Sequence, residues 1–597
     1  MFSQYIIDAF YTHHSFFQSI NQLMNSMVHA NQRIAQNYLK NASGYHHDVR
    51  DIGITYTKFF SKVVVHPISI FKIYELQLGY LANQQKIWQH VFLLSETSLN
   101  LPIIEPKKGD KRFYSADWTD YKWFNFIKQH YLLYSKLLCQ IINEIEVDVK
   151  NRKKLDFYTG QYMSAFSPTN FLFTNPDALK LAIETNGKSL LDGIDNLVKD
   201  LDKGRVTQVD DKAFEVGKNL AITPGYVIYE NDLMQLIQYI PVTKKQYGIP
   251  LLIVPPWINK FYILDLQQKN SFVNFLIEQG ISVYMISWRN PNSGMGHISL
   301  EDYVEKGALK AIEVVKGVSN SDKVNVLGYC LGGTLLSIAC AILSANQKEI
   351  SVNSATFLAA MVDFSDIGPM GDVVDCALIR KLERGELLHN GVLNGHDMET
   401  AFNLIRPNDL IWSYVVNNYL NGKKPSAFDV IYWTNDNTNL PADMYIYYMK
   451  HIILENKLSR KHALHICNTP IDIGKIKFPV IVIGFKDDTI SPAATVFTTS
   501  ELVDGHVEFI LGGSGHVMGV VNPPALNKYG YYLNGKLGNG FDEWKKTSQY
   551  HEGSWWTVYI NRLLALSGNE IESSDKIGNS NYPHIEAAPG RFVMEKC

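Results

Sequence analysis

Hydrophobic side chains in the first hundred residues recur at the spacing of an α-helix. Steps of three, four and seven residues separate Phe2, Ile6, Phe10, Phe17, Ile20, Met24 and Met27. Positions at these steps lie on one face of a helix, so residues 1–100 are predicted to form a helical N-terminal extension. Its apolar face is typical either of a helix that binds a surface or a partner, or of a helix packed against its own protein.

Residues 101–245 also have a mainly helical pattern, with a break at 167–179. A strand-like stretch, YVIYENDLMQLIQYIP, follows at residues 226–241. We therefore expect a second, mainly helical domain that ends at about residue 245.

From residue 246 the pattern changes to strands that alternate with helices. Short apolar runs occupy residues 249–255, 281–288, 323–329, 354–364, 478–485 and 506–513, and helix-like segments occupy 266–280, 300–317 and 334–346. This alternation predicts βαβ units and a mainly parallel sheet in an α/β domain over residues 246–597. The alternation lapses at about residues 365–475, a stretch rich in Trp and Tyr, which predicts a helical insertion over the sheet.

Composition excludes several classes of protein. Hydrophobic residues make up 46% of the chain and charged residues 19%, so a large core is expected. The formal net charge of −3 provides no basic excess, so nucleic-acid binding is not expected. No stretch of about 18 consecutive apolar residues predicts a transmembrane helix, and the start MFSQYIIDAF does not resemble a signal peptide.

The six cysteines are scattered, and no two of them form a CxxC pair. This arrangement favours neither a disulfide framework nor a zinc site. It is typical of a reducing, cytoplasmic setting.

The sequence GYCLGG at residues 328–333 lies between a predicted strand and a predicted apolar helix. This context is that of a nucleophile elbow, the G-x-S-x-G turn of the α/β-hydrolase fold, with Cys330 in place of Ser. Glycine is needed there because the turn is too tight for side chains beside the flanking strand and helix. A glycine-rich turn with a merely buried cysteine is the alternative.

A thiol nucleophile needs a base, and His516 follows a predicted strand in the glycine-rich loop GGSGH. Asp487 and Asp488 follow the preceding predicted strand. In open parallel sheets the functional groups gather at the carboxyl ends of the strands, and the order nucleophile, acid, His matches α/β-hydrolases. The sequence leaves open which of the two aspartates orients the imidazole.

An oxyanion hole in this fold uses the N–H of the residue after the nucleophile, which is Leu331 here. The second donor comes from the loop PPWINK at residues 255–260. Proline has no N–H, so Trp257 or Ile258 is the candidate. A plain connecting loop is the alternative.

Several longer motifs resemble one family, the class I poly(3-hydroxyalkanoate) synthases. They are RFYSADW (112–118), PPWINKFYILDL (255–266), SWRNP (287–291), GYCLGG (328–333), RPNDLIW (406–412), GSGHVMGVVNPP (513–524), GSWW (553–556) and EAAPGRFV (586–593). The resemblance implies that Cys330, Asp488 and His516 are the catalytic triad. Two positions depart from the pattern: several family members have Cys where Trp257 stands and His where Thr489 stands.

The resemblance also implies a reaction. An (R)-3-hydroxyacyl-CoA, expected to be 3-hydroxybutyryl-CoA, is polymerised to polyhydroxyalkanoate and CoA is released, with no further cofactor. Expected partners are the growing polyester chain and a granule surface in the cytoplasm, and a homodimer is expected. The alternatives are a cysteine-dependent thioesterase or hydrolase of the same fold, and a non-catalytic granule-coat protein.

Overall fold

The computed structural model describes residues 67–93, 102–144, 147–346, 351–372, 374–574 and 576–597. The apolar helix pattern at residues 2–27 lies outside these ranges. The chain divides into two compact units, one made of Met1–Asp210 with Phe402–Ser426, the other of Asp211–Ala401 with Ala427–Cys597.

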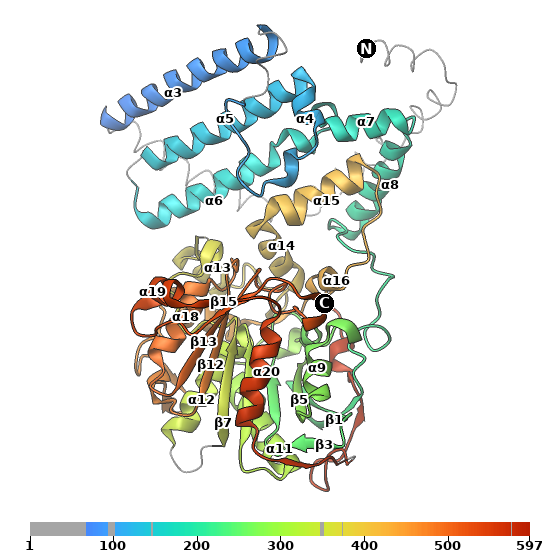
Figure 1. Ribbon diagram of the computed structural model, residues 1–597, viewed down its shortest axis with the longest axis vertical. Coiled ribbons are helices and arrows are strands. Elements are labelled where there is room, and N and C mark those ends of the chain that lie inside the picture. Colours follow the sequence, from blue (N-terminus) through green and yellow to red (C-terminus); the bar gives the residue numbers. More distant parts are fainter. Residues whose placement is uncertain (1–66, 94–101, 145–146, 347–350, 373, 575) are drawn as a thin grey trace. The chain divides into compact units, whose positions relative to one another are not determined.

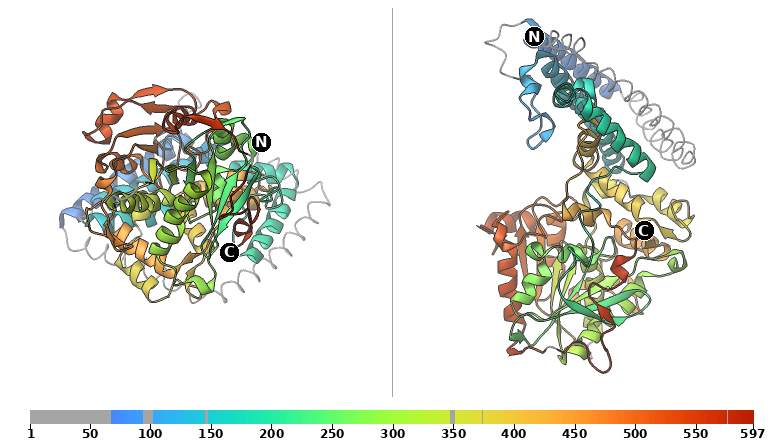
Figure 2. Two further views of the ribbon diagram at one scale, coloured as in Figure 1. Left: turned by 90° about the horizontal axis from the view of Figure 1, so that it is seen from below. Right: turned by 90° about the vertical axis from the view of Figure 1, so that its right-hand side faces the viewer.

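The smaller unit consists of helices and their connections in its described part, as Figures 1 and 2 show. Its α-helices are α3 (Pro67–Trp88), α4 (Asp117–Asp120), α5 (Lys122–Glu144), α6 (Val149–Ala165), α7 (Pro176–Glu184), α8 (Lys188–Lys203) and α15 (Ser413–Val415). Its π-helices are η1 (Gln89–Leu93), η11 (Asn408–Trp412) and η12 (Val416–Leu420). The mainly helical pattern before residue 210 is therefore reproduced.

Part of the predicted insertion at 365–475 belongs to this helical unit. Residues 402–426 pack against α8, where the Tyr419 hydroxyl donates to Asp200 Oδ2 at 2.8 Å. The Asn418 amide donates to the carbonyl of Thr207 at 2.7 Å. Only the flanking parts of the insertion, up to residue 401 and from 427 onward, remain with the sheet.

Among the described residues, eleven strands form one sheet in the larger unit, in the order β15-β14-β13-β12-β7-β6-β4-β5-β2-β1-β17. Its six central strands are parallel to one another: β5 (Val283–Trp288), β4 (Leu251–Val254), β6 (Val324–Tyr329), β7 (Val352–Leu358), β12 (Val480–Phe485) and β13 (Val507–Gly512). They coincide with the six predicted apolar runs, so the mainly parallel sheet is confirmed.

Antiparallel strands extend both edges of the sheet. They are β1 (Gly225–Glu230), β2 (Met234–Tyr239) and β17 (Glu586–Ala587) on one side, and β14 (Tyr531–Leu533) and β15 (Gln549–His551) on the other. The predicted domain boundary at residue 245 is wrong for this reason. The buried strand β2 pairs with β5, so residues 211–245 belong to the larger unit.

Helices cover the sheet because each presents an apolar face to it. They include α9 (Phe272–Glu278), α11 (Lys310–Ser319), α12 (Leu331–Ala345), α18 (Ala493–Leu502) and α20 (Trp555–Leu566). On one face α20 crosses the sheet (Figure 1) and packs on α9, with the rings of Phe272 and Trp556 4.9 Å apart. The buried side chains of α9, α20 and the central strands form one continuous core.

Other elements of the larger unit are short. They include β3 (Lys245–Tyr247), η9 (Tyr303–Leu309), α13 (Cys376–Glu383), α14 (Gly395–Ile405), α16 (Asp429–Asn435), α17 (Ala442–Tyr447), η13 (Tyr448–Leu454), α19 (Gly540–Thr547) and η16 (Phe592–Met594), with α14 continuing past the unit boundary. Within the described residues, no helix combines the length and hydropathy that crossing a bilayer requires.

Gly193 tests the packing of residues 402–426 on α8. A Cβ at this position would clash with the carbonyl oxygen of Tyr419 and would lie 2.7 Å from its carbonyl carbon. Because backbone cannot move aside cheaply, we expect Gly193→Ala to destabilise the protein by about 1–3 kcal/mol in urea melts. Gly160→Ala, in α6 with nothing within 4 Å, is the control and should be neutral or stabilising. Equal effects of the two substitutions would contradict this packing.

Candidate active site

Cys330 lies at the junction between β6 and α12, in a backbone conformation that side chains rarely adopt. Its φ of 52° and ψ of −124° lie outside the ordinary helical and extended regions. Such a conformation costs of order 1–3 kcal/mol and persists only where the surroundings enforce it. The thiol is half-buried at the carboxyl end of the central strand.

The glycines of the turn allow β6 and α12 to lie this close to the neighbouring backbone. A Cβ at Gly332 would clash with the carbonyl oxygen of Val254 and lie 2.5 Å from that of Pro255. At Gly328 it would lie 2.7 Å from the backbone nitrogen of Gly333. The first turn of α12 therefore lies directly against the end of β4, and the residue types expected for a nucleophile elbow are required by contact.

His516 and Asp488 form a close pair beside the cysteine. His516 Nδ1 lies 2.7 Å from Asp488 Oδ2, and both side chains are buried. The other carboxylate oxygen, Oδ1, accepts the N–H groups of Ile490 and Ser491 at 2.8 Å each. These bonds hold the carboxylate, and the carboxylate in turn fixes the orientation of the imidazole.

Asp487, the alternative acid, takes no part in this pair. It is exposed, and its backbone N–H donates to the carbonyl of Ser514 at 2.9 Å. It therefore joins the end of β12 to the loop that carries His516. Of the two neighbouring carboxylates, the structure brings Asp488 to the imidazole.

The imidazole interacts with Cys330 as well. Burial lowers the pKa of His516, but the charges of the Asp488 carboxylate and of a Cys330 thiolate, together with a side-chain hydrogen bond to each, raise it well above the usual 6.5. The ring of Tyr329 stacks on the imidazole with centroids 5.5 Å apart. The site thus favours a protonated imidazole, the form that results when a histidine has taken a proton from a thiol.

Residues 255–260, called the oxyanion loop below, continue β4 beside the elbow. In the parallel pairing of β4 with β6, Val254 is opposite Gly328. Trp257 and Ile258 are buried, and the Trp257 carbonyl accepts the Thr438 hydroxyl at 2.7 Å. The register places this loop next to Leu331, the first residue of α12. The roles of Leu331, Trp257 and Ile258 as oxyanion donors stay predictions.

An aromatic cluster next to the oxyanion loop escaped the sequence reasoning. The ring of Trp257 lies 5.7 Å from those of Tyr303 and Tyr448, and its indole nitrogen is buried with no hydrogen-bond partner in the described part of the chain. Burial, and then the nearby Cys330, raise the pKa of Tyr448. The only signal for Tyr448 in the sequence was the abundance of tyrosine in the insertion, which does not distinguish one tyrosine from another.

Two other positions complete the comparison with the sequence. Thr489 is exposed. Cys340 is completely buried in α12, and burial raises the pKa of its thiol, so it is unsuited to act as a nucleophile. Nowhere in the described ranges do three or more His, Cys, Asp or Glu side chains gather in a way that could hold a metal ion.

The strand–Cys–helix elbow, with an acid and a histidine at the ends of β12 and β13, defines the class as the α/β-hydrolase fold. Residues 249–523 match the family model described as alpha/beta hydrolase fold. Residues 109–276 match the model described as poly-beta-hydroxybutyrate polymerase (PhaC) N-terminus.

Curated relatives extend over most of the chain. It is 40% identical over 527 residues to the poly(3-hydroxyalkanoate) polymerase subunit PhaC of Cupriavidus necator, covering 88% of each chain. It is 39% identical over 517 residues to the poly(3-hydroxyalkanoate) polymerase of Methylorubrum extorquens, covering 86% of this chain and 85% of the relative. The chain belongs to the poly(3-hydroxyalkanoate) polymerase family.

The pairing of Asp488 with His516 predicts a stability difference that depends on pH. A raised pKa stabilises the folded protein fully below the unfolded value of about 6.5, and this contribution is lost as pH rises through the folded pKa. Asp488→Asn removes the carboxylate that raises the pKa of His516. We expect the parent's advantage in urea melts to shrink by at least about 1 kcal/mol between about pH 6 and pH 9.

Asp487→Asn is the matched control for this experiment. Because Asp487 is exposed, the difference in stability between Asp487→Asn and the parent should change little over the same pH range. A difference for Asp488→Asn that does not vary with pH would contradict the pairing.

Proposed function

We propose that this protein polymerises (R)-3-hydroxyacyl-CoA, with 3-hydroxybutyryl-CoA as the expected monomer, and that Cys330 is the nucleophile. The observation that carries the proposal is the Cys330, His516 and Asp488 arrangement at the elbow of a chain in the poly(3-hydroxyalkanoate) polymerase family. A cofactor has no part in the proposal, since CoA enters and leaves as part of the substrate.

The first half-reaction forms an acyl-enzyme. His516 takes the proton of the Cys330 thiol, and the thiolate attacks the carbonyl carbon of the substrate thioester. The N–H of Leu331 and a second donor from Trp257 or Ile258 stabilise the oxyanion. The bond to the CoA sulfur then breaks, CoA leaves as its thiol with the proton from His516, and the acyl group remains on Cys330.

The second half-reaction forms the ester bond. His516 takes the proton of a 3-hydroxyl group from another monomer or a chain end, and that oxygen attacks the acyl thioester on Cys330. The carbon–sulfur bond breaks and the thiol regains a proton from His516. Exchange between thioesters is nearly balanced in free energy, whereas conversion of a thioester to an ester is favourable, so a cysteine nucleophile suits polymer growth.

The acyl-enzyme must be protected from water, because hydrolysis would release free acid. The part of the insertion that remains with the sheet supplies buried aromatic side chains near the site, including Trp433 and Tyr448. Tyr448 and Trp257 pack edge to face with an interplanar angle of 88°. This aromatic cover supports synthesis over hydrolysis by the same three residues.

The remaining parts of the proposal are assignment to class I, a homodimer, and a location in the cytoplasm at the surface of polymer granules. They rest on the motifs at residues 112–118 and 586–593 and on the single long chain. A non-catalytic coat protein would have no need of the buried, fully hydrogen-bonded Asp488 carboxylate beside His516.

Replacing the nucleophile tests the first half-reaction. Cys330→Ala should abolish CoA release while circular dichroism and melting remain those of the parent. Cys340→Ala, in the helix α12 that follows Cys330, is the matched control and should retain activity. If the rate of CoA release by Cys330→Ala is within about tenfold of the parent rate, the activation free energy has changed by only about 1.4 kcal/mol and Cys330 is not the nucleophile.

Analysis of the products separates polymerase from thioesterase. With (R)-3-hydroxybutyryl-CoA we expect one CoA per monomer consumed, by thiol titration, and insoluble polyester with little free 3-hydroxybutyrate, by chromatography. If most of the acyl groups appear as free acid, the protein is a hydrolase with the same triad.

A further inference from the structure

The last residue of the oxyanion loop, Lys260, is a buried lysine. The side chain of Lys260 is 3% exposed, and its ammonium contacts Asp436 Oδ1 at 2.9 Å. It also donates to the backbone carbonyls of Val593 and Glu595 at 2.7 Å each. Since a lysine ammonium has three donors, all three are used, and they join the loop to two distant segments.

Asp436, the partner of Lys260, is also fully engaged. Its Oδ1 contacts the ammonium of Lys596 at 2.7 Å, and its Oδ2 accepts the hydroxyl of Tyr262 at 2.8 Å. Burial lowers the pKa of Lys260 in spite of the opposing carboxylate. A buried ion pair of this kind seldom adds net stability relative to apolar packing, which suggests that it has another task.

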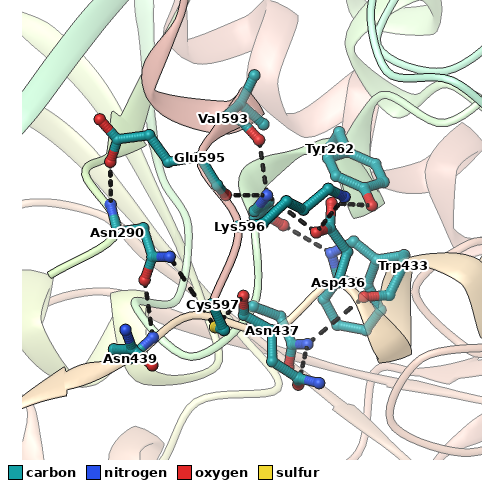
Figure 3. A network of polar contacts seen from close by, with 12 residues as sticks. Tyr262, Asn290, Trp433, Asp436, Asn437, Asn439, Val593, Glu595, Lys596 and Cys597 are labelled. Carbon is teal, nitrogen blue, oxygen red and sulfur yellow. Dashed lines mark hydrogen bonds and ion pairs between the residues drawn. The ribbon is translucent and has the colours of Figure 1, made fainter. Parts of the chain in front are cut away.

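The last six residues, Phe592–Cys597, lie along this network and are called the C-terminal strap. The carboxylate of Glu595 accepts the backbone N–H of Asn290 at 3.2 Å. The thiol of Cys597 donates to the carbonyl of Asn437 at 2.9 Å. The strap is therefore fastened to the segment after β5 and to the segment that follows α16 (Figure 3).

The same segment after α16 also holds the oxyanion loop directly. The Asn259 amide donates to Asn437 Oδ1 at 3.0 Å, and the indole of Trp433 donates to the carbonyl of Lys260 at 2.6 Å. Asn259 itself has a φ of 65°, so the loop turns sharply just before the lysine. Each of these contacts restricts where the backbone of Trp257 and Ile258 can lie.

We propose that Lys260 is a positioning residue for the oxyanion loop and that it acts by fastening the loop to the C-terminal strap and to Asp436. This inference rests on the proposed function, in which that loop supplies an oxyanion donor. A donor moved by about 1 Å can cost about a hundredfold in rate, so a loop held by one buried cation is a sensitive part of the site. Lys260 does not itself contact the reacting atoms.

Lys260→Met is the informative substitution, because it keeps an unbranched side chain as long as the aliphatic part of lysine and removes the ammonium. Asp436 retains Lys596 and Tyr262, so no carboxylate is left unpaired and the variant should fold. We expect the first-turnover release of CoA from (R)-3-hydroxybutyryl-CoA to slow by about 10–100-fold, with KM within about twofold of the parent. Stopped-flow thiol detection measures this rate.

Alkylation of Cys330 by iodoacetamide gives a readout that does not use the oxyanion loop. It should proceed at the parental rate in Lys260→Met, because the cysteine and His516 are untouched. An unchanged rate of CoA release would overturn the proposal. So would a parallel loss of alkylation and of the melting transition, because Lys260 would then serve folding alone.

Arg591→Ala is the control on the same C-terminal segment. Arg591 is half exposed and pairs with Glu230 and Glu586, away from the oxyanion loop. It should leave the rate of CoA release within about twofold of the parent. A slowing equal to that of Lys260→Met would show that any damage to the C-terminal segment suffices, and would refute the specific role of Lys260.

Asp436→Asn, alone and combined with Lys260→Met, tests the connection of Lys260 to Asp436, because the combined variant leaves neither a buried carboxylate nor a buried ammonium without a partner. If the lysine acts through its pairing with Asp436, the combined variant should be no slower than the slower single variant. If the combined variant instead slows CoA release by the product of the two single effects, the lysine does not act in this way. Failure of the proposed function is seen separately, as CoA release that persists in Cys330→Ala.

Discussion

Cys330 has a positive φ and lies where the first turn of α12 contacts the end of β4, so its conformation and that contact depend on each other. The strained backbone directs the thiol out of the carboxyl edge of the sheet. It can persist because Gly328 and Gly332 let helix and strand approach to backbone contact. Parallel pairing of β4, β6, β7, β12 and β13 then brings the other functional groups to the same edge.

Two buried pairs of opposite charge lie at this edge, and both follow one physical rule. His516 with Asp488, and Lys260 with Asp436, are removed from water, which is costly unless every polar atom finds a partner. Asp488 obtains two backbone N–H groups, and Lys260 obtains two backbone carbonyls. One pair raises the pKa of the imidazole, and the other ties down the loop beside the nucleophile.

The aromatic insertion at residues 365–475 is divided between the two units. Residues 402–426 pack against helix α8 of the helical unit, whereas residues 427–475 remain with the sheet and bring Trp433 and Tyr448 to the site. The two parts of the insertion are thus continuous in the chain although they belong to different units.

The sequence by itself determined the six central strands, the elbow at Cys330 and the positions of an aspartate pair and of His516 after two later strands. It could do so because these depend on local signals: apolar runs of strand length, glycines at a tight turn, and polar residues directly after strands. The strand-like stretch at residues 226–241 was recognised, but the sequence did not show that it joins the sheet, because that follows only from the pairing of β2 with β5 and of β1 with β2.

Only the tertiary structure decided the rest. The choice of Asp488 over Asp487 depends on which carboxylate points to the imidazole, and neighbouring positions in a loop have no periodicity that reveals it. The division of the insertion, the position of Tyr448 beside Cys330 and the contact of Lys260 with the C-terminal strap all join residues far apart in the chain. Such contacts arise from packing in three dimensions, and no spacing along the sequence encodes them.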